Sequence, residues 1–257
     1  MHGFIPLASG SKGNCIYLGT AKAKILIDAG ISTRAIQTRL AQIEVDIADI
    51  DAIIITHDHL DHIQGLKVIV KKFQIPVFCN FETAKGICET LKAQPKFKIF
   101  TTNERFEYRD LAVQSFSVKH DTLDPVGLSI MYNGLKIGIC TDIGVVTTSV
   151  INHLIGCDYL YVESNHHPDL VLSSLRPVVY KKRVLGKFGH LSNQECVYLL
   201  SNVISDKLKH IFLAHLSKEC NNEDLALKTV EEFLKEKNHK ASVSIAKQDT
   251  VSNKIEF

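Results

Sequence analysis

A cluster of metal-binding side chains directly follows an apolar strand, and this feature constrains the chain more than any other. Residues 56–62 read THDHLDH, and the four residues before them are alanine and isoleucine, as in strands buried on both faces of a sheet. Alternate side chains of an extended segment point the same way, so His57, His59 and Asp61 can converge, while His62 opens the next helix. We therefore expect a sheet scaffold that presents this segment at one edge.

The chemistry of this segment predicts a metal site. Three imidazoles and two carboxylates lie within six residues. Imidazole nitrogen and carboxylate oxygen together suit zinc, manganese or iron. The absence of thiols nearby argues against a structural zinc site of the cysteine type. The alternative is a polar surface loop that happens to be rich in histidine, and the ligand spacing favours the metal site over it.

Further potential ligands stand at the ends of other apolar strands that the sequence predicts. They are Asp28, His120, Asp142 and His215. One polar residue at the end of each of several strands is how a sheet scaffold gathers a site at one edge. Taken singly, such a residue is more often a turn former or a cap. Together with residues 56–62 they indicate a site for two metal ions, because two coordination shells need more ligands than one segment provides.

The order of the predicted elements favours two sheets with helices. Apolar strands alternate with segments of helical spacing in the first part of the chain. The middle is antiparallel, because Asn133-Gly134 joins two strands and both turn positions need a positive φ. Strands and helices alternate again afterwards, with helix expected over residues 172–188. This order predicts an α+β fold, two packed sheets with helices on the outer faces, in a single domain over residues 1–257.

The composition restricts the partners and the location. No apolar stretch approaches the roughly 18 residues of a membrane span, so no membrane partner is expected. The net charge of +2 is too small to steer nucleic acid, and any polyanion must be bound by local basic patches. Seven widely spaced cysteines without a C-x-x-C pair are expected to be buried thiols of a cytoplasmic protein.

The order of the potential ligands along the chain resembles the metallo-β-lactamase family, whose fold is an αββα sandwich with a two-metal site at one edge. The residues are Asp28, His57-x-His59-x-Asp61-His62, His120, Asp142 and His215. Six further stretches resemble its bacterial YycJ/WalJ-type subfamily: ASGSKGN (8–14), HDTLDPVG (120–127), CTDIG (140–144), ESNHH (163–167), GHLSN (189–193) and AHLSKECN (214–221). That subfamily is associated with DNA exonuclease activity and stands near the tRNA-processing ribonuclease Z and phosphonate-pathway phosphodiesterase branches.

The resemblance implies a role for each ligand. By this resemblance, the first metal ion would be bound by His57, His59 and His120. The second metal ion would be bound by Asp61, His62 and His215, and Asp142 would bridge the two ions. Asp61 is also expected to be catalytic, and Asp28 would orient a ligand by hydrogen bonds. In true β-lactamases a cysteine commonly stands at the position of Asp142, so the aspartate favours phosphate esters.

Residues outside the ligand set are expected to act on the substrate. Relatives that cleave nucleic acid have a histidine in a similar place to His190. By this resemblance His190 would be a general acid or a phosphate contact. The alternative is that His190 only packs near a helix start. Asn165 and His166 follow a predicted strand and are expected to touch the substrate, the alternative being a capped loop. Lys182 and Arg183 lie in the densest basic segment and are expected to contact a polyanion, although most such runs are solvated.

Together these expectations predict a metal-dependent hydrolase of phosphodiester bonds. The favoured activity is that of a DNA exonuclease, which acts 5′ to 3′ by family resemblance. A hydroxide that bridges two divalent ions (zinc, manganese or iron) would attack phosphorus, and DNA is favoured over RNA as the partner. One alternative is a small-molecule hydrolase of the same fold, acting on a thioester, lactone or cyclic phosphodiester. Another is a binding module that has lost catalysis, which the complete ligand set disfavours.

Overall fold

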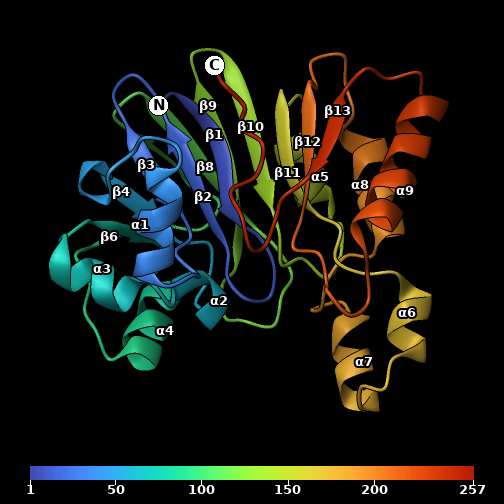
Figure 1. Cartoon of the computed structure of the whole chain (residues 1–257), viewed down its shortest axis with the longest axis horizontal. Coiled ribbons are helices and arrows are strands. Elements are labelled where there is room, and N and C mark those ends of the chain that lie inside the picture. The colour runs from blue at the N-terminus through green and yellow to red at the C-terminus, as the bar shows by residue number, and fades with distance from the viewer. The chain divides into compact units, whose positions relative to one another are not determined.

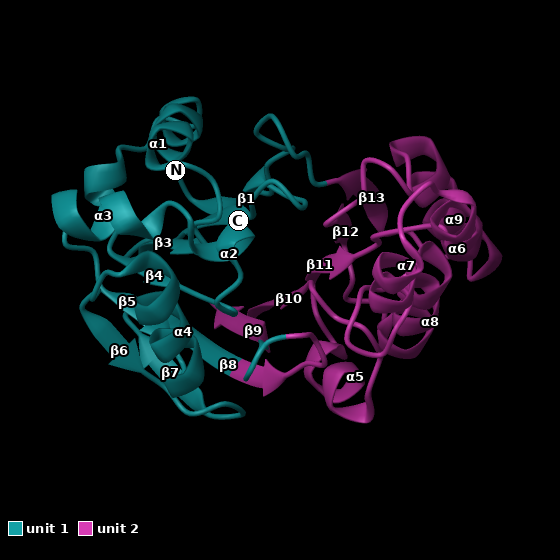
Figure 2. Ribbon diagram, turned by 90° about the horizontal axis from the view of Figure 1, so that it is seen from below, with its two compact units in different colours: residues 1–114, 122–125, 246–257 teal, residues 115–121, 126–245 magenta.

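The computed structural model describes residues 1–257, which form two compact units (Figure 2). Unit 1 comprises residues 1–114, 122–125 and 246–257, and unit 2 comprises residues 115–121 and 126–245. The C-terminal segment returns to unit 1, where Phe4 and Ile255 exchange backbone hydrogen bonds of 2.9 and 3.0 Å. The expectation of a single domain stays a prediction.

The first sheet lies entirely in unit 1. Its strands follow in chain order: β1 (Gly3–Ala8), β2 (Cys15–Gly19), β3 (Lys24–Ile27), β4 (Ala52–Ile54), β5 (Val77–Cys79) and β6 (Phe97–Ile99). The first three strands are antiparallel, and β3 to β6 are parallel. Parallel strands need crossover connections, and helices supply them here. The helices of this unit are α1 (Thr33–Ala41), η1 (Ile47–Asp49), α2 (Leu60–Ile63), α3 (Leu66–Lys72) and α4 (Phe81–Leu91).

The core of unit 1 joins its helices to one face of this sheet. Side chains of α1, α3 and α4 pack with those of β3, β4 and β5 in one buried cluster. The three helices are labelled in Figure 1. In α1, Ile36 and Leu40 are four residues apart and both fully buried, so they share the face that packs inward. Ser32 caps this helix, because its side chain accepts a hydrogen bond from the backbone of Ala35.

The second sheet has the strand order β13-β12-β11-β10-β9-β8-β7. The strands are β7 (Arg105–Tyr108), β8 (Leu111–Ser117), β9 (Val126–Tyr132), β10 (Leu135–Cys140), β11 (Tyr159–Glu163), β12 (His210–Ala214) and β13 (Ser242–Ile245). The strands β10 to β13 are parallel, whereas β9 pairs with β10, and β7 with β8, in antiparallel register. The helices of unit 2 are α5 (Thr148–Leu154), α6 (Pro168–Ser173), α7 (Val178–Val184), α8 (Asn193–Val203) and α9 (Glu223–Glu236).

The core of unit 2 joins α5, α8 and α9 to the parallel strands. Leu160, Val162, Ile211 and Leu213 of β11 and β12 belong to the same buried cluster as apolar residues of these three helices. The start of α8 is fixed by a capping box, in which Ser192 and Glu195 bond each other's backbone nitrogen. This local interaction fixes where α8 begins.

Several predicted elements are confirmed. The hairpin between β9 and β10 turns at Asn133 and Gly134, whose φ values are 45° and 79°. The α+β class, with two mixed sheets and helices, is also confirmed. No helix of the structure is both long and apolar enough to cross a lipid bilayer.

The helix predicted over residues 172–188 is wrong as a single element. The structure has the two short helices α6 and α7 there, and Pro177 stands between them as the N-cap of α7 with an extended ψ of 151°. Proline has no backbone N–H to donate and disfavours helical geometry in the residue before it, so it separates the two helices. The strand β1 was not predicted, because Gly3 and Pro6 weaken the strand pattern of residues 3–8.

Candidate metal centre

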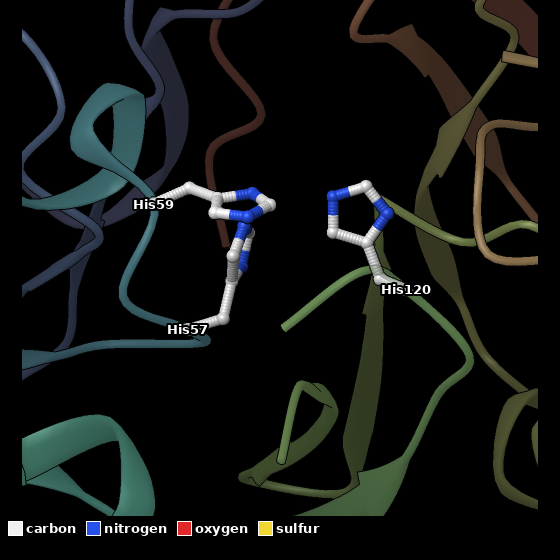
Figure 3. A group of neighbouring side chains, drawn as sticks. All are labelled: His57, His59 and His120. Carbon is white, nitrogen blue, oxygen red and sulfur yellow. The ribbon is translucent and has the colours of Figure 1, made fainter. Parts of the chain in front are cut away.

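The segment THDHLDH carries the ligand side chains of unit 1 directly after β4. His57 and His59 lie in the extended stretch between β4 and α2, and their rings meet edge to face with centroids 4.8 Å apart (Figure 3). The expectation that Asp61 lies on this extended stretch is wrong, because α2 begins at Leu60 and includes Asp61 and His62. The helix still brings His62 close, with its ring centroid 4.0 Å from that of His57.

Asp28 and Thr56 fix the orientation of two of these rings. Asp28 follows β3, and its Oδ2 atom lies 2.8 Å from Nδ1 of His62. The hydroxyl of Thr56 lies 2.9 Å from the same carboxylate oxygen and 3.0 Å from Nδ1 of His57. Because the carboxylate can only accept, Thr56 donates to Asp28 and accepts from His57. Both imidazoles therefore carry their proton on Nδ1 and their lone pair on Nε2, and in this structure the Nε2 atom of His62 accepts from the amide of Asn14.

Asn14 is a site residue that the sequence reasoning missed. It lies in the loop between β1 and β2, and its Nδ2 atom is 2.9 Å from Nε2 of His62. Its backbone nitrogen donates to the carbonyl of Asp61, and its own carbonyl accepts from Gly30. A Cβ atom at Gly30 would lie 1.5 Å from the Asp61 carbonyl oxygen, so this close approach of three chain segments requires glycine. The sequence signal that could have found it is the stretch ASGSKGN (8–14), which ends at Asn14.

The ligand side chains of unit 2 follow the ends of three strands. His120 follows β8 (Figure 3), Asp142 follows β10 and His215 follows β12, and all three are at most 3% exposed. Asp142 and His215 have φ values of 54° and 55°, and Asp28 has 60° in unit 1. These left-handed residues redirect the chain where each strand ends. Nδ1 of His120 donates to the carbonyl of Gly189 over 3.0 Å.

Glu163 at the end of β11 is the second site residue that was missed. Its side chain is fully buried, and Oε1 accepts from Nδ1 of His190 at 2.9 Å and from Nδ1 of His215 at 2.8 Å. Its Oε2 accepts from the backbone nitrogens of Ile143 and Leu191. Burial raises the pKa of Glu163, but the two histidines lower this pKa by more, to about 2. The group is a carboxylate, and it binds two imidazoles at once.

His190 lies between two other histidines of unit 2. Its ring centroid is 5.1 Å from those of both His120 and His215, and 17% of its side chain is exposed. One potential metal cluster of this unit contains Asp142, Glu163, His190 and His215, with ligand atoms within 4.8 Å of one another. The backbone nitrogen of His190 is bonded to the carbonyl of Val184, the last residue of α7.

The residues expected to touch the substrate have different surroundings. The amide of Asn165 donates to the carbonyl of His215 over 2.6 Å, so it supports the left-handed turn there. His166 is buried, its Nδ1 atom has no hydrogen-bond partner, and burial lowers its pKa. Lys182 is exposed, and Arg183 forms an ion pair with Asp121, the neighbour of His120. Their contacts with a substrate stay predictions.

The donor chemistry of these residues fits divalent metal ions. Nitrogen and oxygen atoms form the potential metal clusters, and the seven cysteines are free thiols outside them. Five histidines of these clusters donate from Nδ1 to an oxygen: His57, His62, His120, His190 and His215. Metal-binding histidines are commonly held in this way, because the bond orients the ring and raises the basicity of the other nitrogen. Such a set accepts zinc, manganese or iron.

Comparison with known proteins decides the family. The protein-family model of the beta-lactamase superfamily domain matches residues 23–211 of this chain. The chain belongs to this superfamily. It is similar to the exodeoxyribonuclease YycJ of Bacillus anthracis, with 36% identity over 91% of this chain and 89% of that protein. The exodeoxyribonuclease WalJ of Streptococcus pneumoniae is 34% identical over 87% of this chain and 85% of its own length.

A comparison of structures agrees with the predicted fold. The metallo-beta-lactamase fold protein YhfI of Bacillus subtilis matches with a TM-score of 0.71 and 16% identity, over 98% of this chain and 99% of that one. The resemblance to the metallo-β-lactamase fold and to the YycJ/WalJ group is thus confirmed. The chain is a hydrolase of the metallo-β-lactamase family.

Proposed function

We propose that this hydrolase cleaves phosphodiester bonds of DNA as an exonuclease that acts 5′ to 3′. The observation that carries the proposal is the pair Glu163–His190, which holds a partly exposed imidazole beside Asp142 among nitrogen and oxygen donors. Such an imidazole can protonate an alkoxide leaving group, which phosphodiester cleavage requires. The two exodeoxyribonucleases, similar over nearly their whole length, support DNA as the substrate.

We propose that the chain binds two divalent ions. The first would be held by His57, His59 and His120, the second by Asp61, His62 and His215, with Asp142 shared. The hydrogen bonds that fix Nδ1 of four of these histidines support the assignment, and Asp28 orients His62. When bound, the ions activate water at neutral pH and neutralise phosphate oxygens.

The chain's own residues move the protons. Nδ1 of His190 keeps its proton and donates it in a hydrogen bond to Glu163. Nε2 of His190 faces the departing oxygen and gives it a proton. Asp61 is partly exposed, with 26% of its side chain open, and its carboxylate takes up the proton that the attacking water releases. Glu163 is a buried carboxylate, and its bond to Nδ1 fixes the orientation of the His190 ring.

Residues away from the reacting bond would also contact the substrate. Lys182 is exposed and can contact a phosphate, whereas Arg183 must exchange its bond to Asp121 for one. We propose that Asn165 and His166 lie beside the substrate, because Asn165 bonds the turn that carries His215 and His166 is the next residue in the chain. The seven free cysteines favour a reducing compartment, and we propose the cytoplasm.

One experiment tests the activity directly. Protein loaded with zinc or manganese is incubated with 5′- and 3′-labelled single- and double-stranded DNA and RNA, beside bis-p-nitrophenyl phosphate. We expect stepwise shortening of DNA from the 5′ end and no cleavage by the H59A or D142A variants. The matched control is H2A, because His2 is an exposed histidine near the N-terminus. Cleavage of the generic ester alone would favour the small-molecule hydrolase, and activity in both ligand variants would refute the assignment.

A further inference from the structure

The segment that contains α6 and α7 exposes an unusual number of apolar side chains. Fifteen large apolar residues of the chain are exposed, and six of them lie between residues 172 and 188. We call these six the α6–α7 patch: Leu172, Leu175, Val178, Val179, Leu185 and Phe188. Leu175 is 104% exposed and Val179 is 80% exposed. Single exposed apolar residues are ordinary, but a group of this size in a short segment indicates a binding surface.

The helical period explains which side chains face outward. Tyr180 and Val184 of α7 are four residues apart and pack on the small core that also contains Val171 and Cys220. The opposite face of α7 therefore carries Val178, Val179 and Lys182. Apolar and cationic side chains share one face, and α6 lies beside α7 (Figure 1).

The same segment is strongly basic. Residues 168–188 contain the five cations Arg176, Lys181, Lys182, Arg183 and Lys187 and the single acid Asp169, which gives a net charge of 5 − 1 = +4. The whole chain carries only +2. Arg176 and Arg183 already form ion pairs with Glu219 and Asp121. Lys182 and Lys187 are exposed and are the cations most accessible to an anion.

The C-terminal end of α7 is bonded to the candidate metal centre within unit 2. The carbonyl of Val184 accepts from the backbone nitrogen of His190, and the carbonyl of Gly189 accepts from Nδ1 of His120. A Cβ atom at Gly189 would lie 2.2 Å from the carbonyl oxygens of Arg183 and Val184, so this turn packs directly on the end of the helix. A polymer that reaches His190 can therefore extend over the α6–α7 patch.

We propose that the α6–α7 patch binds a nucleic-acid strand with unpaired bases, as the strand enters the catalytic site. The inference rests on the proposed function and names the form of its substrate. Unpaired bases offer apolar faces that fit Leu175, Val178 and Val179, while their phosphates fit Lys182 and Lys187. An intact duplex stacks those faces against one another and leaves little apolar surface for the patch.

The charge argues against a second copy of this chain as the occupant. In a symmetric dimer the same surface meets itself, so two segments of +4 would face each other. A lipid surface with anionic head groups would satisfy the charge as well. The bonds of α7 to His190 favour the nucleic acid, because they connect the patch to the residue that acts on the substrate.

The test measures binding by fluorescence anisotropy over a series of salt concentrations. The protein as purified is mixed with a fluorescein-labelled single strand of about 20 nucleotides, which exceeds the site size of comparable surfaces, or with its blunt duplex. Phosphorothioate linkages slow cleavage during the measurement. The variants are L175S/V178S/V179S for the apolar side chains and K182Q/K187Q for the cations. The controls are I155S, a similarly exposed apolar residue of unit 2, and K207Q, an exposed lysine elsewhere.

We expect L175S/V178S/V179S to bind the single strand about five- to tenfold more weakly, and to bind the duplex within about twofold of the wild type. K182Q/K187Q should weaken binding of both and reduce the salt slope for the single strand by about 1.4, since each phosphate contact contributes about 0.7. Both controls should bind as the wild type does. The substituted side chains are exposed, so unchanged circular dichroism and melting temperature will show that the variants are folded.

Three results would overturn the inference. The first is a single-strand affinity that the apolar triple variant leaves unchanged, or that falls equally for the duplex. The second is a wild-type dimer, seen by light scattering, that the triple variant dissociates. The third is binding to phosphatidylserine vesicles that the triple variant loses while it still binds the single strand. Failure of the proposed function can be distinguished from failure of this inference. In that case the protein would bind the single strand through the patch but would cleave no phosphodiester bond.

Discussion

Replacement of Glu163 by glutamine tests the role of this buried carboxylate most sharply. The carboxylate accepts from four donors: two backbone nitrogens at Oε2 and the Nδ1 atoms of His190 and His215 at Oε1. Glutamine has one acceptor oxygen and one amide group that donates. In either orientation the amide faces a pair of donors, so two of the four hydrogen bonds are lost.

The magnitude follows from those two bonds. Hydrogen bonds to a charged group contribute about 1.5–3 kcal/mol each, and relief of the desolvation of the carboxylate offsets part of the loss. We therefore expect E163Q to lower the free energy of unfolding by about 2–4 kcal/mol and the melting temperature by about 5–15 °C. Because the rings of His190 and His215 lose their fixed orientation, metal affinity and activity should each fall about 10- to 100-fold.

The assay combines thermal unfolding with metal titration against a chromophoric chelator. The matched control is E195Q, because Glu195 is an exposed glutamate of the same unit that bonds only the start of α8. E195Q should cost about 1 kcal/mol or less in stability and leave metal affinity unchanged. If E163Q melted within about 1 °C of the wild type, below the shift expected for 1 kcal/mol, and bound metal equally well, our view of Glu163 would be refuted.

Three further predictions concern unit 1 and the metal. G30A should lower the free energy of unfolding in urea by more than about 3 kcal/mol, because the added methyl group would clash with the Asp61 carbonyl. The control G134A should cost about 1 kcal/mol, since nothing lies near Gly134, and equal losses would contradict the packing argument. D28N should weaken metal binding about 10- to 100-fold in chelator competition, because His62 loses its carboxylate partner, and an unchanged affinity would exclude this role. Removal of metal by a chelator should lower the melting temperature, and added zinc or manganese should restore it in proportion to the logarithm of free metal; a melting temperature independent of metal would contradict the site.

The polar side chains at strand ends could be predicted because their signal is local. An apolar run followed by a polar residue marks a strand end, and Asp28, His120, Asp142 and His215 all follow such runs in the structure. The same local pattern located most helices and strands. It also placed Asp61 on an extended segment, because a short helix such as α2 has too few residues to show a period.

The supporting residues could not be predicted because their partners are distant in the chain. Glu163 contacts residues 27 and 52 positions away, and Asn14 contacts His62 across 48 positions. A buried glutamate at a strand end and an asparagine in a loop have many ordinary explanations when taken alone. Only the packed structure shows that each contacts an imidazole, so sequence reasoning proposes potential ligands but does not find the groups that orient them.

The backbone at three strand ends explains why local rules are insufficient at this centre. Asp28, Asp142 and His215 adopt left-handed φ values, which cost a residue with a Cβ atom about 1–3 kcal/mol each. Specific tertiary bonds stabilise these turns: the nitrogen of Asp28 donates to the carbonyl of Ile54, and Asn165 donates to the carbonyl of His215. Because a relaxed strand end would continue in the β region, the sheet alone would direct these side chains elsewhere. The strain is therefore retained where it turns a carboxylate or an imidazole toward the other polar side chains of the candidate centre in its unit, and these hydrogen bonds maintain it.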